Sequence, residues 1–180
     1  MCRFRRGNDA RSFPPIRLTG EASRERSTIV SKLAEALTML HPGNVKVAAM
    51  FVDSAFGAVI VERLRQMGHT NVFEVSFGAP SPDAKHDANY RAFMWRKSKD
   101  WCLTGALPAK DTRMETDATG PGYHINTRNQ LVLESKADMQ RRGVASPDDW
   151  DAHALTFAQQ VAPAAKPMPQ GPYVRPNPWG

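Results

Sequence analysis

The strongest constraint on the fold is an apolar run, Val45 to Val52, that ends in an aspartate. The run is rich in β-branched residues and nearly continuous, which is typical of a strand buried on both faces of a parallel sheet. Helical spacing precedes it over 28–40 and follows it over 57–67, and an alternating strand pattern occupies 72–77. This alternation of strands and helices predicts right-handed crossovers and an α/β sheet covered on both sides.

The remaining elements are shorter. Residues 11–19 contain a short alternating segment suited to an edge strand, and 87–103 is expected to be a long helix. A hairpin joins 123–125 to 130–133, a short helix covers 134–142, and a last helix runs from Ser146 to about Val161. We therefore expect one domain over 1–161, followed by a proline-rich disordered tail over 162–180.

The formal charge of +6 sits at the two ends of the chain. Residues 27–161 hold 15 basic and 15 acidic side chains, so the centre is not by itself a polyanion-binding module. The two cysteines, Cys2 and Cys102, exclude a disulfide framework and a paired cysteine metal site. No apolar run reaches the ~20 residues of a membrane span, so we expect a cytoplasmic protein.

Asp53 is the first candidate for chemistry. Ligands of parallel sheets bind outside the carboxyl ends of the strands, and Asp53 ends the central strand. The helix that follows begins immediately, and aspartate is also a favoured helix N-cap. Position alone leaves the catalytic and the capping interpretations equally open.

The segment Ser146 to Asp151 is the second candidate. Ser146 is expected to be the N-cap and Pro147 the first helical residue, with Asp149 completing a capping box. Asp151 lies one turn further on, on the apolar side of the helix, where an acid needs a partner. Asp148 shares its face, so both could bind a divalent cation jointly with Asp53.

Carboxylates gathered from a strand end and a helix are what a Mg²⁺ or Mn²⁺ site for phosphodiester cleavage requires. Lys136 follows a strand end and either meets a phosphate or is simply a solvated lysine. The acids Glu62, Glu74, Asp87 and Asp138 are expected on solvated faces. The five histidines have no zinc-type spacing, and the chain contains no Gly-rich phosphate loop, which excludes nucleotide hydrolysis by that machinery.

Several stretches, taken in order, resemble the C-terminal nuclease domain of tailed-phage terminase large subunits. The resemblance covers about residues 3–160 and is carried by Phe4 to Ala10, Val52 to Gly57, Phe77 to Ala79, Met94-Trp95, Gly120 to Tyr123, Leu133 to Lys136, Arg142 to Asp149 and Ala154 to Ala158.

The resemblance implies a ribonuclease H-like fold, a mixed sheet flanked by helices, and two-metal cleavage of concatemeric DNA during packaging. The family's acidic ligands fall on Asp53, Asp151 and Asp148. Basic side chains that would contact DNA are Lys136, Arg141, Arg142, Arg96 and Lys97. The implied partners are double-stranded DNA, the terminase small subunit and the portal or procapsid, in the cytoplasm of a bacterial host.

The sequence departs from the family pattern in four respects. The family's first strand, with its founding aspartate, and its motor ATPase have no counterpart here, and His153 and Trp150 replace an aliphatic and a small residue. We therefore expect an unpaired sheet edge and an incomplete metal site. The chain is then either a metal-dependent endonuclease domain or an inactive prophage remnant that binds DNA or serves assembly. A small α/β binding domain whose aspartates only cap helices is a third interpretation.

Overall fold

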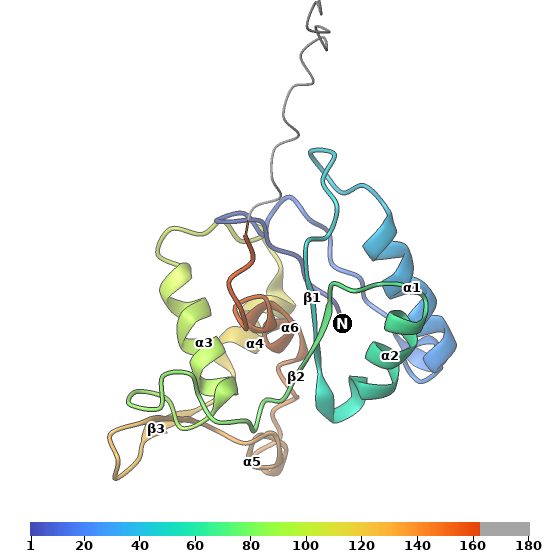
Figure 1. Ribbon diagram of the computed structural model, residues 1–180. Helices are drawn as coiled ribbons and strands as arrows, with labels where there is room; N and C mark the ends of the chain where they lie inside the picture. The colour runs from blue at the N-terminus through green and yellow to red at the C-terminus, as the bar shows by residue number, and fades with distance from the viewer. Residues whose placement is uncertain (163–180) are drawn as a thin grey trace, which may run out of the picture.

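The structure, a computed structural model, describes residues 1–162 (Figure 1). Its centre is the strand–helix–strand unit that the sequence predicts: β1 (Met50–Asp53), α2 (Ser54–Gln66) and β2 (Val72–Val75). The two strands pair in parallel, with Met50 opposite Val72 and Asp53 opposite Val75. The expected tail lies outside the described residues from position 163 onward.

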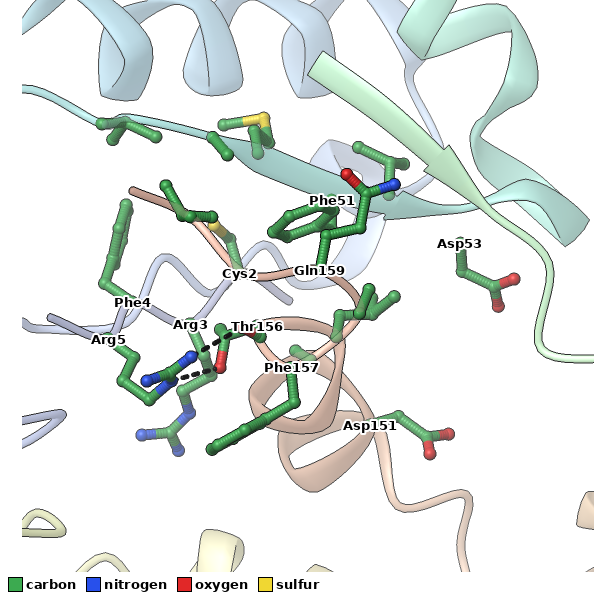
Figure 2. Close-up of a pocket in the computed structure, with 18 of the residues that line it drawn as sticks. Cys2, Arg3, Phe4, Arg5, Phe51, Asp53, Asp151, Thr156, Phe157 and Gln159 are labelled. Carbon is green, nitrogen blue, oxygen red and sulfur yellow. Dashed lines mark hydrogen bonds between the residues drawn. The ribbon is translucent and has the colours of Figure 1, made fainter. Parts of the chain in front are cut away.

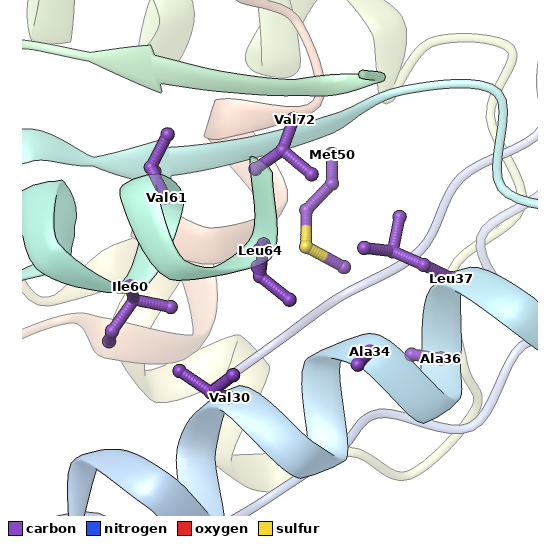
Figure 3. Packing of buried hydrophobic residues seen from close by; sticks show 9 residues of the cluster. All are labelled: Val30, Ala34, Ala36, Leu37, Met50, Ile60, Val61, Leu64 and Val72. Carbon is purple, nitrogen blue, oxygen red and sulfur yellow. The ribbon is translucent and has the colours of Figure 1, made fainter. Parts of the chain in front are cut away.

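The first hydrophobic cluster joins this unit to helix α1 (Arg26–Thr38), which follows a 3-10 turn, η1 (Gly20–Ser23). Figure 3 shows how the side chains of α1, β1, α2 and β2 meet; the buried members are Val30, Ala34, Ala36, Leu37, Met50, Ile60, Val61, Leu64 and Val72. We call this set cluster 1. Leu64 and Ala36 are fully buried, so the helical spacing of both helices is explained by one shared core.

A second cluster lies on the other face of the strands. It is built by α3 (Tyr90–Trp101), α4 (Thr112–Thr119) and α6 (Asp148–Leu155), together with Val75 at the end of β2. Its buried members, called cluster 2, are Val75, Met94, Trp95, Met114, Trp150, Ala154 and Ala158. A hairpin of β3 (Tyr123–Ile125) and β4 (Leu131–Leu133) and the short α5 (Lys136–Arg141) connect α4 to α6.

The expectation of one mixed sheet is met only in part. Residues 1–162 contain a two-stranded parallel sheet and a separate two-stranded hairpin. The expected edge strand within 11–19 is reduced to a single bridge between Cys2 and Ile16. β1 begins five residues later than predicted because the chain turns back at His41–Val45, and Asn71 Nδ2 holds the carbonyl of Val47 at 2.8 Å.

Two helix predictions also need correction. α6 ends at Leu155 instead of Val161, because Arg5 Nη2 donates a hydrogen bond to the carbonyl oxygen of Thr156 at 2.8 Å. α4 was not predicted; Asp111 caps it by accepting a hydrogen bond from the amide of Met114 at 3.2 Å. Within residues 1–162, none of the helices is long and apolar enough to cross a membrane.

Candidate functional site

A cleft of about 1990 Å³ opens between the end of β1 and the helix α6. Asp53, Asp148 and Asp151 all line it, so the fold brings the three predicted aspartates to one cavity. Figure 2 shows Asp53 and Asp151 with their carboxylates directed toward the same open region.

Asp53 has the capping role that one of its two interpretations predicts. Its carboxylate accepts a hydrogen bond from the amide of Ala55 at 3.2 Å, at the start of α2. The side chain is partly exposed at the rim of the cleft, and among residues 1–162 no cation pairs with it. Capping uses one oxygen, so Asp53 keeps acceptor capacity on the cleft side.

Asp151 is buried, with 4 % of its surface exposed, and its partners are positive or proton-donating. Arg91 Nε donates to Oδ1 at 3.0 Å, Trp95 Nε1 donates to the same oxygen at 2.7 Å, and Lys136 Nζ lies 3.0 Å from Oδ2. The sequence predicts that an acid on the apolar side of this helix needs a partner, and Asp151 has such partners. Both carboxylate oxygens are already engaged.

Asp148 lies on the same helix but points to solvent, with 69 % of its side chain exposed. Ser146 Oγ donates to its Oδ1 at 2.7 Å, and Lys136 Nζ is 3.8 Å from that oxygen. The ammonium of Lys136 therefore lies between Asp148 and Asp151, where the sequence predicts a shared divalent cation.

These residues do not fit the predicted two-metal centre. Carboxylates are suitable donors for a hard divalent cation, but two ions need several such ligands close together. Among residues 1–162, no three His, Cys, Asp or Glu side chains gather closely enough to hold a metal ion. The ammonium of Lys136 and the guanidinium of Arg91 supply the positive charge that Asp151 needs.

Most of the predicted DNA-binding residues form ion pairs within the chain. Arg96 binds Asp87 through two nitrogens, Arg141 pairs with Asp138, and Arg142 Nε donates to Glu134 at 2.7 Å. The hydrogen bonds from Arg142 lower the pKa of Glu134 to about 2.

Lys97 is exposed and lines the cleft, beside the ring of Phe93. No acidic partner for Lys97 occurs within residues 1–162. It is therefore the predicted contact most available to a ligand.

Two expectations about acids were wrong. Asp87 is fully buried instead of solvated, and it is neutralised by Arg96. Asp149 does not complete a capping box, because the hydroxyl of Ser146 donates its hydrogen bond to Asp148 and Pro147 occupies the N-cap position. Asp149 is instead buried in a network of ion pairs with Arg3, Arg17 and, through these arginines, Asp111.

Sequence reasoning also missed Arg91 and Trp95 as partners of Asp151. Arg91 is a charged residue of α3, yet it is buried. The available signal was spacing: Arg91 and Trp95 are four apart, so they share one helix face, and that face also carries the core residues.

His153 is the other unexpected feature of α6. It is fully buried between the rings of Trp101, Trp150 and Phe157, with centroids 5.1 to 5.4 Å away. Both ring nitrogens lack a hydrogen-bond partner within the described chain. Burial, assisted by the charges of Arg5 and Arg3, lowers its pKa to about 3.

Comparison with known proteins places this geometry in context. The sequence matches no family model and no curated relative. The structure is similar to the nuclease domain of the large terminase subunit gp2 of bacterial virus Sf6, with 15 % identity and a TM-score of 0.57. That match covers 88 % of this chain and 80 % of the other.

A lysine-to-alanine variant of the Sf6 domain with calcium matches at 14 % identity and a TM-score of 0.57, covering 87 % of this chain and 80 % of that one. The variant with manganese and beta-thujaplicinol matches at 13 % identity and a TM-score of 0.58, covering 87 % of this chain and 80 % of that one. This chain therefore has the fold of a terminase nuclease domain, and the expected ribonuclease H-like arrangement of one mixed sheet stays a prediction.

Proposed function

We propose that this chain is a DNA-binding domain of the terminase nuclease type, acting in phage DNA packaging, and that it does not cleave DNA by itself. The observation that carries the proposal is the charge of the cleft. Six basic side chains line it against three acidic ones; the basic residues are Arg3, Arg5, Arg6, Lys46, Lys97 and Lys136.

The basic residues of the cleft have two different roles. Arg3 and Arg5 tie the N-terminal segment to α6, Arg3 through Asp149 and Arg5 through Thr156. Lys97 and Lys46 are exposed at the cleft and can contact phosphates. A cationic lining with free lysines attracts a polyanion and makes its affinity depend on salt.

The contacts of Asp151 support the proposal that the chain does not cleave DNA by itself. Metal-assisted hydrolysis needs carboxylate oxygens that are free for the cation, whereas those of Asp151 bind Arg91, Trp95 and Lys136. We assign no catalytic step to this arrangement. By the same resemblance, the partners would be double-stranded DNA and the other components of the packaging machinery, namely the terminase small subunit and the portal.

Fluorescence anisotropy with a labelled duplex tests the binding proposal. The logarithm of the affinity should fall linearly with the logarithm of the salt concentration, and Lys97→Gln should reduce the slope by about 1. Lys32→Gln is the control, because Lys32 is exposed on α1 and pairs with Glu35 away from the cleft. Equal slopes for both variants and the unchanged chain would refute a role of the cleft in DNA binding.

A metal-dependent endonuclease is the second candidate. It is favoured by one observation: Asp53 and Asp151, from a strand end and a helix, open into one cleft. If this candidate is correct, Asp53→Asn and Asp151→Asn should each abolish divalent-dependent cleavage while leaving the salt slope of DNA binding unchanged.

A further inference from the structure

Two phenylalanine rings lie at the end of the cleft that is formed by the start of α3. Phe77 follows β2 and Phe93 belongs to α3, and both line the cleft. The two segments are joined where the amide of Arg91 donates to the carbonyl of Phe77 at 3.0 Å. Both rings are half-buried and pack against cluster 2, so the protein supports one side of each ring. An aromatic surface therefore borders the cleft that we propose to bind DNA.

The ring of Phe93 is held in place by its neighbours. The centroid of the Tyr90 ring lies 5.8 Å from that of Phe93, and Tyr90 Oη donates to the carbonyl of Ala158 at 2.5 Å. The guanidinium carbon of Arg96 is 5.9 Å from the centroid of Phe93, and Arg96 is fixed in turn by its ion pair with Asp87. A ring that is already fixed loses little conformational entropy when a ligand stacks on it.

The two rings differ in the lysine beside them. Lys136 Nζ lies 5.9 Å from the centroid of Phe77, and Asp151 holds this ammonium at 3.0 Å. Lys97 Nζ lies 5.7 Å from the centroid of Phe93, but Lys97 is exposed and has no acidic partner within residues 1–162. Phe93 is therefore the ring that a ligand can reach when the lysine beside it moves to a phosphate.

A ring beside a free ammonium matches a nucleotide whose base is unpaired. The ammonium attracts the phosphate, and the ring stacks on the base, as aromatic side chains do in proteins that bind single-stranded DNA. Inside a duplex, each base is stacked between its neighbours, so Phe93 cannot reach its face. A duplex can therefore use only Lys97, whereas an unpaired nucleotide can use both groups.

We propose that the Phe93 end of the cleft binds single-stranded DNA, with one unpaired base stacked on Phe93 and the adjoining phosphate at Lys97. The substrate class is then DNA with unpaired nucleotides, such as a duplex that carries a single-stranded tail. This inference rests on the proposed DNA binding and names the form of DNA that the cleft prefers. Stacking of one base strengthens binding by about fivefold to about 150-fold, whichever base is present.

Fluorescence anisotropy with three labelled ligands tests the inference. The ligands are a blunt duplex, the same duplex with a single-stranded tail of about 8 nucleotides, and the same duplex with an abasic tail of equal length. The intact and the abasic tail carry the same phosphates, so the difference in affinity between them measures the contribution of the bases. At equal salt, the intact tail should bind at least about fivefold more tightly than the abasic tail.

Two variants of Phe93 assign this difference to the ring. Phe93→Leu should bind the intact and the abasic tail equally, because leucine is apolar but has no aromatic face. Phe93→Tyr keeps the ring and should keep the preference for the intact tail. The comparison of the two tails on the unchanged chain needs no variant, so it decides the matter even if Phe93→Leu fails to fold.

Phe73→Leu is the matched control. Phe73 is a half-buried residue of β2 whose ring stacks on that of Phe51 at 5.7 Å, and it does not line the cleft. This variant should prefer the intact tail as strongly as the unchanged chain does.

Equal affinity of the unchanged chain for the intact and the abasic tail would overturn the inference, as would a preference that persists in Phe93→Leu. In either case, a blunt duplex whose salt slope still falls in Lys97→Gln would leave the proposed DNA binding standing. Absence of binding to all three ligands would instead refute the proposed function, and the inference with it.

Discussion

Replacing His153 by leucine should make the protein more resistant to acid. The imidazole is fully buried, both its nitrogens are unpaired within the described chain, and its pKa is lowered to about 3 by burial and by nearby arginines. An unfolded chain binds a proton at this residue below its ordinary pKa of 6.5, whereas the folded chain does so only near pH 3. The folded state therefore loses stability relative to the unfolded state as the pH falls from 6.5 to 3.

The size of the effect follows from this difference. Each pH unit between the two pKa values contributes about 1.4 kcal/mol, so the loss is about 2 kcal/mol at pH 5 and approaches about 5 kcal/mol at pH 3. At pH 7, leucine also removes two unpaired polar atoms, a gain of about 1–3 kcal/mol. The loss of aromatic contacts with Trp101, Trp150 and Phe157 costs about 0.5–1.5 kcal/mol of stability for each well-formed pair, and this cost offsets the gain. The net change at pH 7 is therefore small, and the advantage of His153→Leu should appear below pH 6.5.

Urea unfolding between pH 4 and pH 7 measures the effect. The free energy of unfolding should depend less steeply on pH in His153→Leu than in the unchanged protein. His153→Gln is the matched control: it removes the proton site but keeps a buried polar group, so it should flatten the pH dependence while still carrying the cost of buried polar atoms at pH 7. Identical pH slopes for the unchanged protein and His153→Leu would refute the reasoning.

Three further substitutions test the contacts that hold the site together. Arg91→Ala should cost about 3 kcal/mol or more in urea unfolding, because it removes the main buried partner of Asp151. Asp87→Asn should cost about 3 kcal/mol, since it breaks a pair whose acid is fully buried; a cost below 1 kcal/mol would show that Arg96 finds other partners. Gly57→Ala should cost about 1–3 kcal/mol and lower the thermal midpoint, because a Cβ there would overlap the Cγ1 of Val52.

The sequence predicts the strand–helix–strand unit well because its elements have strong local patterns. The apolar run before Asp53 and the helical spacing after it produce β1 and α2, and both share cluster 1. The ends of the elements were predicted less well, because they depend on residues that are distant in the sequence. β1 begins later than predicted because Asn71 binds the carbonyl of Val47, and α6 ends earlier because Arg5 binds the carbonyl of Thr156. α4 has few buried residues, with only Met114 in the core, so its pattern is weak.

The three predicted aspartates line one cleft, but the sequence did not predict the charged partners of Asp151. Strand ends and helix faces are local properties, and they brought Asp53, Asp148 and Asp151 to one cleft. The pairing of Asp151 with Arg91 joins residues 60 positions apart in the sequence. Such contacts depend on how α3 packs against α6, which no spacing rule contains.

We propose that the cleft binds DNA while Asp151, held by Arg91 and Lys136, does not support cleavage. Supercoiled plasmid incubated with the purified chain and Mn²⁺ tests this claim most directly, at salt concentrations where anisotropy shows the duplex to be bound. We expect the plasmid to stay supercoiled. Nicking that requires Mn²⁺ and disappears in both Asp53→Asn and Asp151→Asn would contradict it and establish an active nuclease.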